Sequence, residues 1–154
     1  KIIVVDAEPH LVQPWRMAGY VTSIVEQEGP IHSDEVARRI AYAFGKNRAG
    51  GRIHDAVVSA LKIAANKKSI CHESSFWFTE SQRDEPPIRS RSEESSPTTK
   101  AEYLSHLEIE AAAKLIRTEC GELEEDEMVR AVCRLLGYLR AGPDLQSRIR
   151  TVLF

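Results

Sequence analysis

The sequence predicts a mainly α-helical protein with a small β-wing, built from tandem winged-helix or helix-turn-helix-like repeats. The first observation behind this prediction is an internal repeat, since a shift of 92 positions places residues 24–61 on residues 116–153 without a gap. The second is that glycine punctuates both copies at matching places, such as Gly45 and Gly137. The third is a change of hydrophobic period after Lys68, from helical spacing to two short strand-like runs. A repeat of this length indicates one supersecondary unit built twice.

Helical spacing of apolar residues predicts three helices in the first copy, over about residues 19–27, 34–44 and 52–66. The prolines that come before these helices predict an extended approach to the first of them. Ser33 is the expected N-cap of the second helix, because its hydroxyl oxygen can accept a hydrogen bond from the free N–H groups of the first turn. His32 is expected to cap or orient the same turn.

Two short runs, residues 69–71 and 75–78, predict a β-hairpin after the third helix. Three helices followed by a hairpin form the winged-helix arrangement, which is a variant of helix-turn-helix. Strand alternation sends Phe76 and Phe78 to one side of the hairpin and Trp77 to the other. Core packing is expected for at least the phenylalanine pair, which would leave Trp77 exposed for stacking or partner contact; the reverse arrangement stays open.

Composition shifts divide the chain into an arm, two units and a linker. The expected boundaries are 1–18 for the N-terminal arm, 19–79 for the first winged-helix-like unit, 80–103 for a Ser/Pro/charged linker and 104–154 for a second, truncated winged-helix-like unit. The linker is expected to bury almost nothing, because it offers little apolar surface. The β-branched run at residues 1–6 predicts a strand or an extended arm. The second unit should contain three helices, over about residues 104–119, 125–136 and 143–154.

Composition and charge narrow the classes of protein to consider. Apolar residues make up 42% and charged residues 29% of the 154 residues, as in a globular chain. The formal charge of −2 gives no global sign of a nucleic-acid partner, so such a sign must be local. Three cysteines without CxxC spacing favour a reducing cytoplasm. The sequence starts with Lys and stops where a second wing would begin, so we expect a piece of a longer protein.

Basic residues gather in the turn before the third helix, on that helix and at the entry to the wing. In winged helices these parts approach DNA, where Lys and Arg neutralise phosphates and other polar side chains reach base edges. The predicted DNA-binding residues are Lys46, Arg48, Arg52, His54, Ser59, Lys62, Lys67 and Lys68. A solvated helix face is the alternative interpretation of the same pattern.

No pattern in the sequence predicts catalysis, a metal site or a cofactor. His32, His54, His72 and Cys71 fit no metal-ligand spacing. The Ala-Gly-Gly run at residues 49–51 lacks the ending of a phosphate-binding loop. The acidic residues of the two copies lie at predicted helix starts, which the helix dipole explains without any chemistry.

Residues 28–57 resemble an uncharacterised C-terminal domain of large bacterial proteins that carry a superfamily-1 helicase core and a Vsr-like endonuclease domain. The motifs that carry the resemblance are Glu28-Gly29-Pro30-Ile31-His32, the Arg38-Arg39 pair, Gly45, Arg48-Ala49-Gly50 and Phe76-Trp77-Phe78. The second copy matches as well, so the resemblance covers roughly residues 22–153. It implies a helicase-associated domain without an assigned activity.

The residues and the resemblance together predict a non-catalytic DNA-binding accessory module of a larger helicase/nuclease-type protein, with a role in restriction or defence. The expected partners are DNA, duplex or forked, and the helicase and nuclease domains of the parent chain, with no membrane; a homodimer stays open. The alternative is a protein-interaction or dimerisation module of the same parent protein, because fold alone does not decide function.

Overall fold

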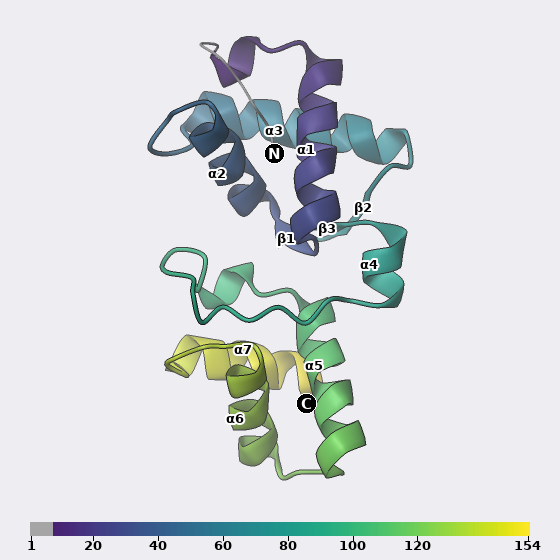
Figure 1. The fold of residues 1–154 in the computed structure, drawn as a ribbon, viewed down its shortest axis with the longest axis vertical. Helices are drawn as coiled ribbons and strands as arrows, with labels where there is room; N and C mark the ends of the chain where they lie inside the picture. Colours follow the sequence, from purple (N-terminus) through teal and green to yellow (C-terminus); the bar gives the residue numbers. More distant parts are fainter. Residues whose placement is uncertain (1–7) are drawn as a thin grey trace. The chain divides into compact units, whose positions relative to one another are not determined.

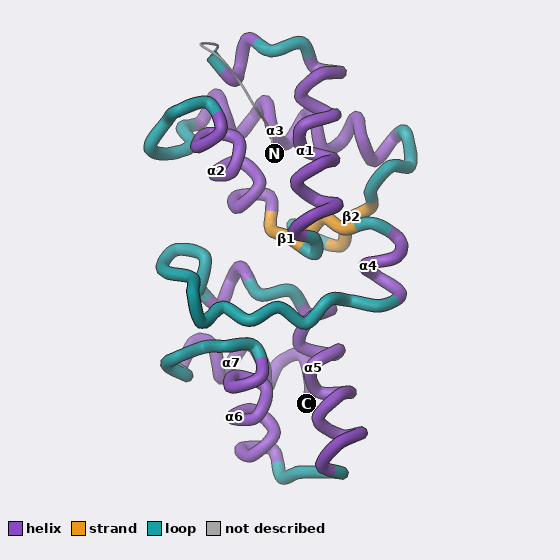
Figure 2. The backbone as a smooth tube through the Cα atoms, in the orientation of Figure 1, coloured by secondary structure: helices purple, strands orange, loops and turns teal. Residues whose placement is uncertain are grey.

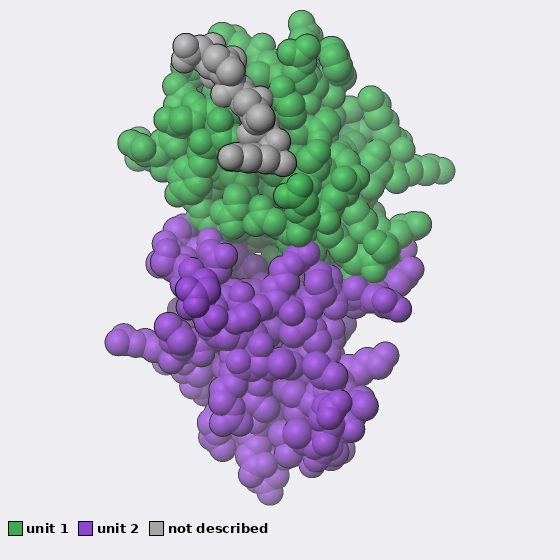
Figure 3. Space-filling model, viewed as in Figure 1, with its two compact units in different colours: residues 1–82 green, residues 83–154 purple. Residues whose placement is uncertain are grey.

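Residues 8–154 are described by the structure, which is a computed structural model. The chain divides into two units, Lys1–Gln82 and Arg83–Phe154, which Figure 3 colours separately. The strand or arm predicted at residues 1–6 lies outside the described residues.

Unit 1 has the element order of a winged helix (Figure 1). After a 3-10 turn at Pro9–Leu11 come α1 (Pro14–Glu28), β1 (Ile31–His32), α2 (Ser33–Ala43), α3 (Gly51–Asn66), β2 (Cys71–Glu73) and β3 (Phe76–Phe78). The three helices pack around one apolar core, and the strands form one small antiparallel sheet (Figure 2). The predicted class, mainly α with a small β-wing, is therefore confirmed. A short helix, α4 (Glu80–Asp84), follows the sheet.

The sheet contains a strand that the sequence did not predict. The strand order is β1-β3-β2, and Ile31 of β1 pairs with Trp77 of β3. A strand of two residues is too short for alternation to be visible in the sequence. Trp77 is only 5% exposed and packs in the helical core, so the option of an exposed Trp77 was wrong. Phe76 and Phe78 are buried, as expected.

The first helix begins earlier than predicted. It starts at Pro14, whereas we expected an extended segment up to residue 19. Proline is favoured in the first turn of a helix because its missing N–H has no partner there in any case. The extra turn adds Met17 and Ala18 to the buried stripe of α1.

The start of α2 is capped by a histidine rather than by a serine. His32 is the N-cap, and its Nδ1 accepts a hydrogen bond from the backbone N–H of Asp34 at 3.0 Å. Ser33 is the first helical residue, so its prediction as N-cap was wrong. The capping role expected for His32 is confirmed.

Unit 2 repeats the three helices of unit 1 (Figure 1). Its elements are a 3-10 turn at Ala101–Tyr103, α5 (His106–Cys120), α6 (Glu125–Leu135) and α7 (Pro143–Leu153). Each of them begins 92 positions after its counterpart in unit 1, and the 3-10 turn, α5 and α6 also end 92 positions after theirs. The repeat therefore extends back to Pro9, well before the start at residue 24 that the sequence comparison found.

The segment predicted as a linker, residues 80–103, is divided between the two units. Gln82 is buried, and its side-chain amide donates to the backbone oxygen of Val25 at 2.8 Å. Further along, the backbone N–H of Arg91 donates to the backbone oxygen of Leu136 at 2.8 Å. Gln82 is the only buried residue of this segment, so the expectation that it buries almost nothing is confirmed, although some of its polar groups form hydrogen bonds with the helical units. Within residues 8–154, no helix combines the length and the apolarity that crossing a bilayer requires.

Candidate nucleic-acid interface

The turn between α2 and α3 positions the basic surface of unit 1. Gly45 follows α2 with φ +76°, a left-handed conformation that glycine adopts without a Cβ penalty. Gly50 is then the N-cap of α3. The core-facing side of α3 is formed by Ile53, Val57, Ala60, Leu61 and Ala64. The opposite side of the helix is left to solvent.

Basic side chains outnumber acidic ones on the exposed side of α3 and at its two ends. Its exposed polar residues are Arg52, Asp55, Ser59, Lys62 and Asn66, and Lys67 and Lys68 follow at the end of the helix. Arg48 is exposed in the turn before α3. Among the described residues, no acidic side chain forms an ion pair with Arg48, Arg52, Lys62, Lys67 or Lys68. These five side chains define the α3 cationic surface.

Lys46, also predicted to bind DNA, has a partner within unit 1. Its Nζ lies 2.8 Å from Oε1 of Glu8, and both side chains are partly exposed. The hydrogen bond from Lys46, together with its positive charge, lowers the pKa of the Glu8 carboxyl. Lys46 therefore lies at the edge of the α3 cationic surface with its charge already balanced.

His54 and Ser59, the predicted base-reading residues, differ in their surroundings. Nε2 of His54 lies 2.9 Å from Oδ1 of Asp34, at the start of α2. Its ring is therefore held between the two helices, although it remains partly exposed. Ser59 is exposed in the middle of α3. The sequence did not reveal the His54–Asp34 pair, because the two residues are 20 positions apart and only the packing of α2 on α3 brings them together.

The corresponding helix of unit 2, α7, uses its arginines internally. Arg148 donates to the backbone oxygen of Leu104 at 3.2 Å. Arg150 pairs with Glu125 at 3.4 Å and with Asp126 at 2.6 Å. These carboxylates lie at the start of α6, so Arg150 of α7 neutralises acidic side chains of its own unit.

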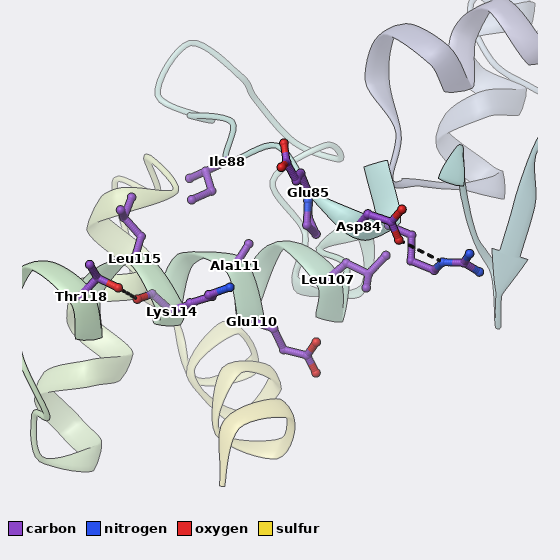
Figure 4. A pocket seen from close by; sticks show the side chains of 11 residues that line it. Asp84, Glu85, Ile88, Leu107, Glu110, Ala111, Lys114, Leu115 and Thr118 are labelled. Atoms are coloured by element: carbon purple, nitrogen blue, oxygen red, sulfur yellow. Dashed lines mark hydrogen bonds and ion pairs between the residues drawn. The ribbon is translucent and has the colours of Figure 1, made fainter. Parts of the chain in front are cut away.

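Beyond the α3 cationic surface, residues 8–154 contain a groove but no cluster of metal ligands. The described His, Cys, Asp and Glu side chains form no group of three or more that could hold a metal ion. A groove of about 460 Å³ lies in unit 2, between α5 and residues 83–88 (Figure 4). Its charged lining residues, of both signs, are Arg83, Asp84, Glu85, Glu110 and Lys114. Apolar side chains such as Ile88 and Leu115 complete the walls.

A winged-helix unit with a basic third helix is the class of protein that the fold and the site define. Residues 8–55 match the model of a family described as a protein of unknown function, DUF3320. The match spans α1, β1, α2 and the start of α3. It supports the resemblance to an uncharacterised domain family over these residues, and its description assigns no activity. No curated protein and no solved structure matches the chain.

Proposed function

We propose that this chain is a non-catalytic DNA-binding module in which α3 approaches the duplex. The observation that supports the proposal is the α3 cationic surface, whose five side chains are exposed and lack acidic partners among the described residues. Arg52 and Lys62 lie on α3, the helix that winged-helix proteins commonly place in the major groove, and the other three lie just before and just after it. A row of unpaired cations is suited to contacts with successive phosphates, which release counterions on binding.

The side chains have different roles in this proposal. Arg48, Arg52, Lys62, Lys67 and Lys68 contact phosphates. Ser59 is placed to reach a base edge, since it lies exposed between Arg52 and Lys62 on the same side of α3. Lys46 and His54 contribute less than the sequence alone suggested, because each already has an acidic partner in Glu8 and Asp34.

The larger setting of the module is also a proposal. The motif resemblance supports an accessory domain of a larger helicase/nuclease-type protein acting in restriction or defence, whereas the family match over residues 8–55 names no parent protein. Its partners there would be duplex or forked DNA and the catalytic domains of the parent chain. The module itself contributes affinity and positioning rather than chemistry.

The test is a salt titration of DNA binding. Fluorescence anisotropy with a labelled duplex and a labelled fork should give binding at micromolar protein in low salt, with affinity falling steeply as salt rises. The variant Lys62→Glu combined with Lys67→Glu should lower affinity by about tenfold or more and reduce the salt slope by about 2, one for each lost phosphate contact.

The matched control is Arg130→Glu combined with Arg134→Glu, on the exposed side of α6 in unit 2. It changes the net charge by the same amount and should leave affinity nearly unchanged. Absence of binding at low salt, or an equal loss in both double variants, would overturn the proposal.

A protein-interaction or dimerisation module remains the second candidate because of one observation. Leu11 and Trp15 are 74% and 62% exposed at the start of unit 1. Leu11 ends the 3-10 turn and Trp15 lies in the first turn of α1, and exposed large apolar side chains are of the kind that protein partners cover. Sedimentation velocity at increasing concentration distinguishes this candidate, because a Trp15→Ser variant should abolish self-association and leave DNA binding intact.

A further inference from the structure

Residues 88–92 of unit 2 form an extended segment, called the strap here, that binds beside the turn after α6. The backbone N–H of Arg91 donates to the backbone oxygen of Leu136 at 2.8 Å. A Cβ atom added to Gly137 would lie 2.6 Å from the backbone nitrogen of Arg91. The strap backbone therefore contacts the turn so closely that no side chain fits at Gly137.

The side chain of Arg91 fixes the strap from the other side. Its guanidinium forms an ion pair with Glu108 of α5, which is only 1% exposed, and lies 5.7 Å from the ring centroid of Tyr138. Burial raises the pKa of Glu108, and the neighbouring Arg91 opposes that shift. Leu136, Gly137, Glu108 and Tyr138 together form the binding seat of the strap.

Unit 1 has Phe44, Gly45, Arg16 and Lys46 at the positions 92 residues before Leu136, Gly137, Glu108 and Tyr138, and these four define the seat of unit 1. Gly45 has φ +76°, as Gly137 does, and a Cβ atom added to it would meet none of the described residues within 4 Å. The backbone oxygen of Phe44, which corresponds to that of Leu136, accepts no hydrogen bond from the part of the chain that the structure describes. The backbone half of the seat is thus preserved and open among these residues.

The charge of the seat is reversed between the units. Glu108 of unit 2 corresponds to Arg16 of unit 1, and Tyr138 corresponds to Lys46. An arginine in the position of Arg91 would be repelled by Arg16, whereas a carboxylate would be attracted by Arg16 and, once it has displaced Glu8, by Lys46. Lys46 already holds the carboxylate of Glu8 at 2.8 Å, so a carboxylate is bound at this point of the seat.

We propose that the seat of unit 1, formed by Arg16, Phe44, Gly45 and Lys46, binds an extended acidic segment of a partner protein. A backbone N–H of that segment donates to the Phe44 oxygen, and its carboxylate lies between Arg16 and Lys46, displacing Glu8. This inference goes beyond DNA binding, because Arg16 belongs to α1 and not to the α3 cationic surface. The proposed partner segment binds as the strap does in unit 2, through its extended backbone, but carries the opposite charge.

The test uses a labelled peptide with the strap sequence and reversed charges, acetyl-Ile-Glu-Ser-Glu-Ser-amide, titrated with the full chain. It should bind about tenfold or more tightly than acetyl-Ile-Arg-Ser-Arg-Ser-amide, since like charges across an interface cost several kcal/mol. Arg16→Glu should reduce affinity about tenfold, and Glu8→Gln should raise it severalfold by removing the competing carboxylate. Circular dichroism checks that each variant is folded.

Two further arms separate a specific seat from general charge attraction. A peptide N-methylated at its second glutamate lacks the N–H for the Phe44 oxygen and should lose most of its affinity. Arg134→Glu, the matched charge reversal on α6, should leave peptide binding unchanged. Equal binding of the acidic and basic peptides, no effect of N-methylation, or an equal loss in Arg16→Glu and Arg134→Glu would overturn the proposal. Lys62→Glu, which should weaken DNA binding, leaves the peptide affinity as it is, so the two proposals fail separately.

Discussion

Units 1 and 2 share a backbone plan and differ in what their surfaces bind. Helices α1 and α2 correspond to α5 and α6 at a constant offset of 92 positions, and a glycine with φ +76° follows both α2 and α6. However, the exposed cations of α3 have no acidic partner among the described residues, whereas those of α7 bind within their own unit. Packing keeps apolar residues on the buried faces of the helices in both units, while exposed positions change charge at little cost in stability.

The largest stability effect expected from this comparison comes from the strap, which the described part of unit 1 lacks. Arg91→Ala leaves Glu108 buried without its cation, and breaking such a pair costs about 3–5 kcal/mol of unfolding free energy. Urea unfolding measures the loss, and hydrogen exchange should assign it to the amides of α5 and α6. Arg134→Ala, an exposed control, should cost less than about 0.5 kcal/mol.

The Arg91→Ala defect should depend on pH. Burial raises the pKa of Glu108 above its unfolded value, and the positive charge of Arg91 lowers it. Removing Arg91 should therefore raise the folded pKa of Glu108 further. A raised carboxyl pKa means that the folded state binds the proton more tightly, so its stability contribution is present at low pH and lost as pH rises through the folded pKa. The defect should therefore shrink as the pH falls through the raised folded pKa of Glu108, and it should level off below about 4, near the unfolded pKa of Glu. A defect that grows on acidification would contradict the assignment.

The next largest difference between the units is expected at Gly45 and Gly137, the glycines that follow α2 and α6. Gly45→Ala should lower the unfolding free energy by about 1–2 kcal/mol, because alanine is strained at a positive φ. Gly137→Ala should lose the same amount for its positive φ. Its new Cβ would also clash with the strap, and this overpacking should lower the unfolding free energy by about 1–3 kcal/mol more. Thermal unfolding of the two variants measures the difference. Equal losses would mean that the strap yields easily at this point.

The smallest expected effect concerns the starts of α2 and α6. His32→Ala removes the side-chain cap of α2 and should cost about 1 kcal/mol. Glu124, its counterpart before α6, makes no side-chain cap hydrogen bond, so Glu124→Ala should be nearly neutral. Chemical denaturation of both variants under one set of conditions gives the comparison. A loss in Glu124→Ala that equals that of His32→Ala would show that the cap contributes nothing particular to unit 1.

Much of the scaffold could be predicted from local patterns. Both copies of the three-helix unit follow from apolar periodicity and from the glycines at positions 45 and 137, because helix faces and helix ends depend on neighbouring residues. The early start of α1 at Pro14 was missed, since a proline can begin a helix as well as precede one. The two-residue strand β1 was missed because only its pairing with β3 defines it.

The candidate site divides in the same way. The sequence singled out the basic residues of α3, but not that Lys46 and His54 would find partners in Glu8 and Asp34, which lie 38 and 20 positions away. It also treated the strap as a solvated linker. Its composition is polar, and its binding to unit 2 depends on one buried carboxylate, that of Glu108, and one glycine, Gly137.

The sequence by itself determined that this protein contains one helical unit built twice, with a wing after the first copy and a basic third helix. These features depend on the order and spacing of residues along a few turns of chain. Only the tertiary structure decided which charges are open to a partner and which are satisfied within the fold. The physical reason is that the availability of a side chain depends on groups brought close by packing, and their distance along the chain does not record that proximity.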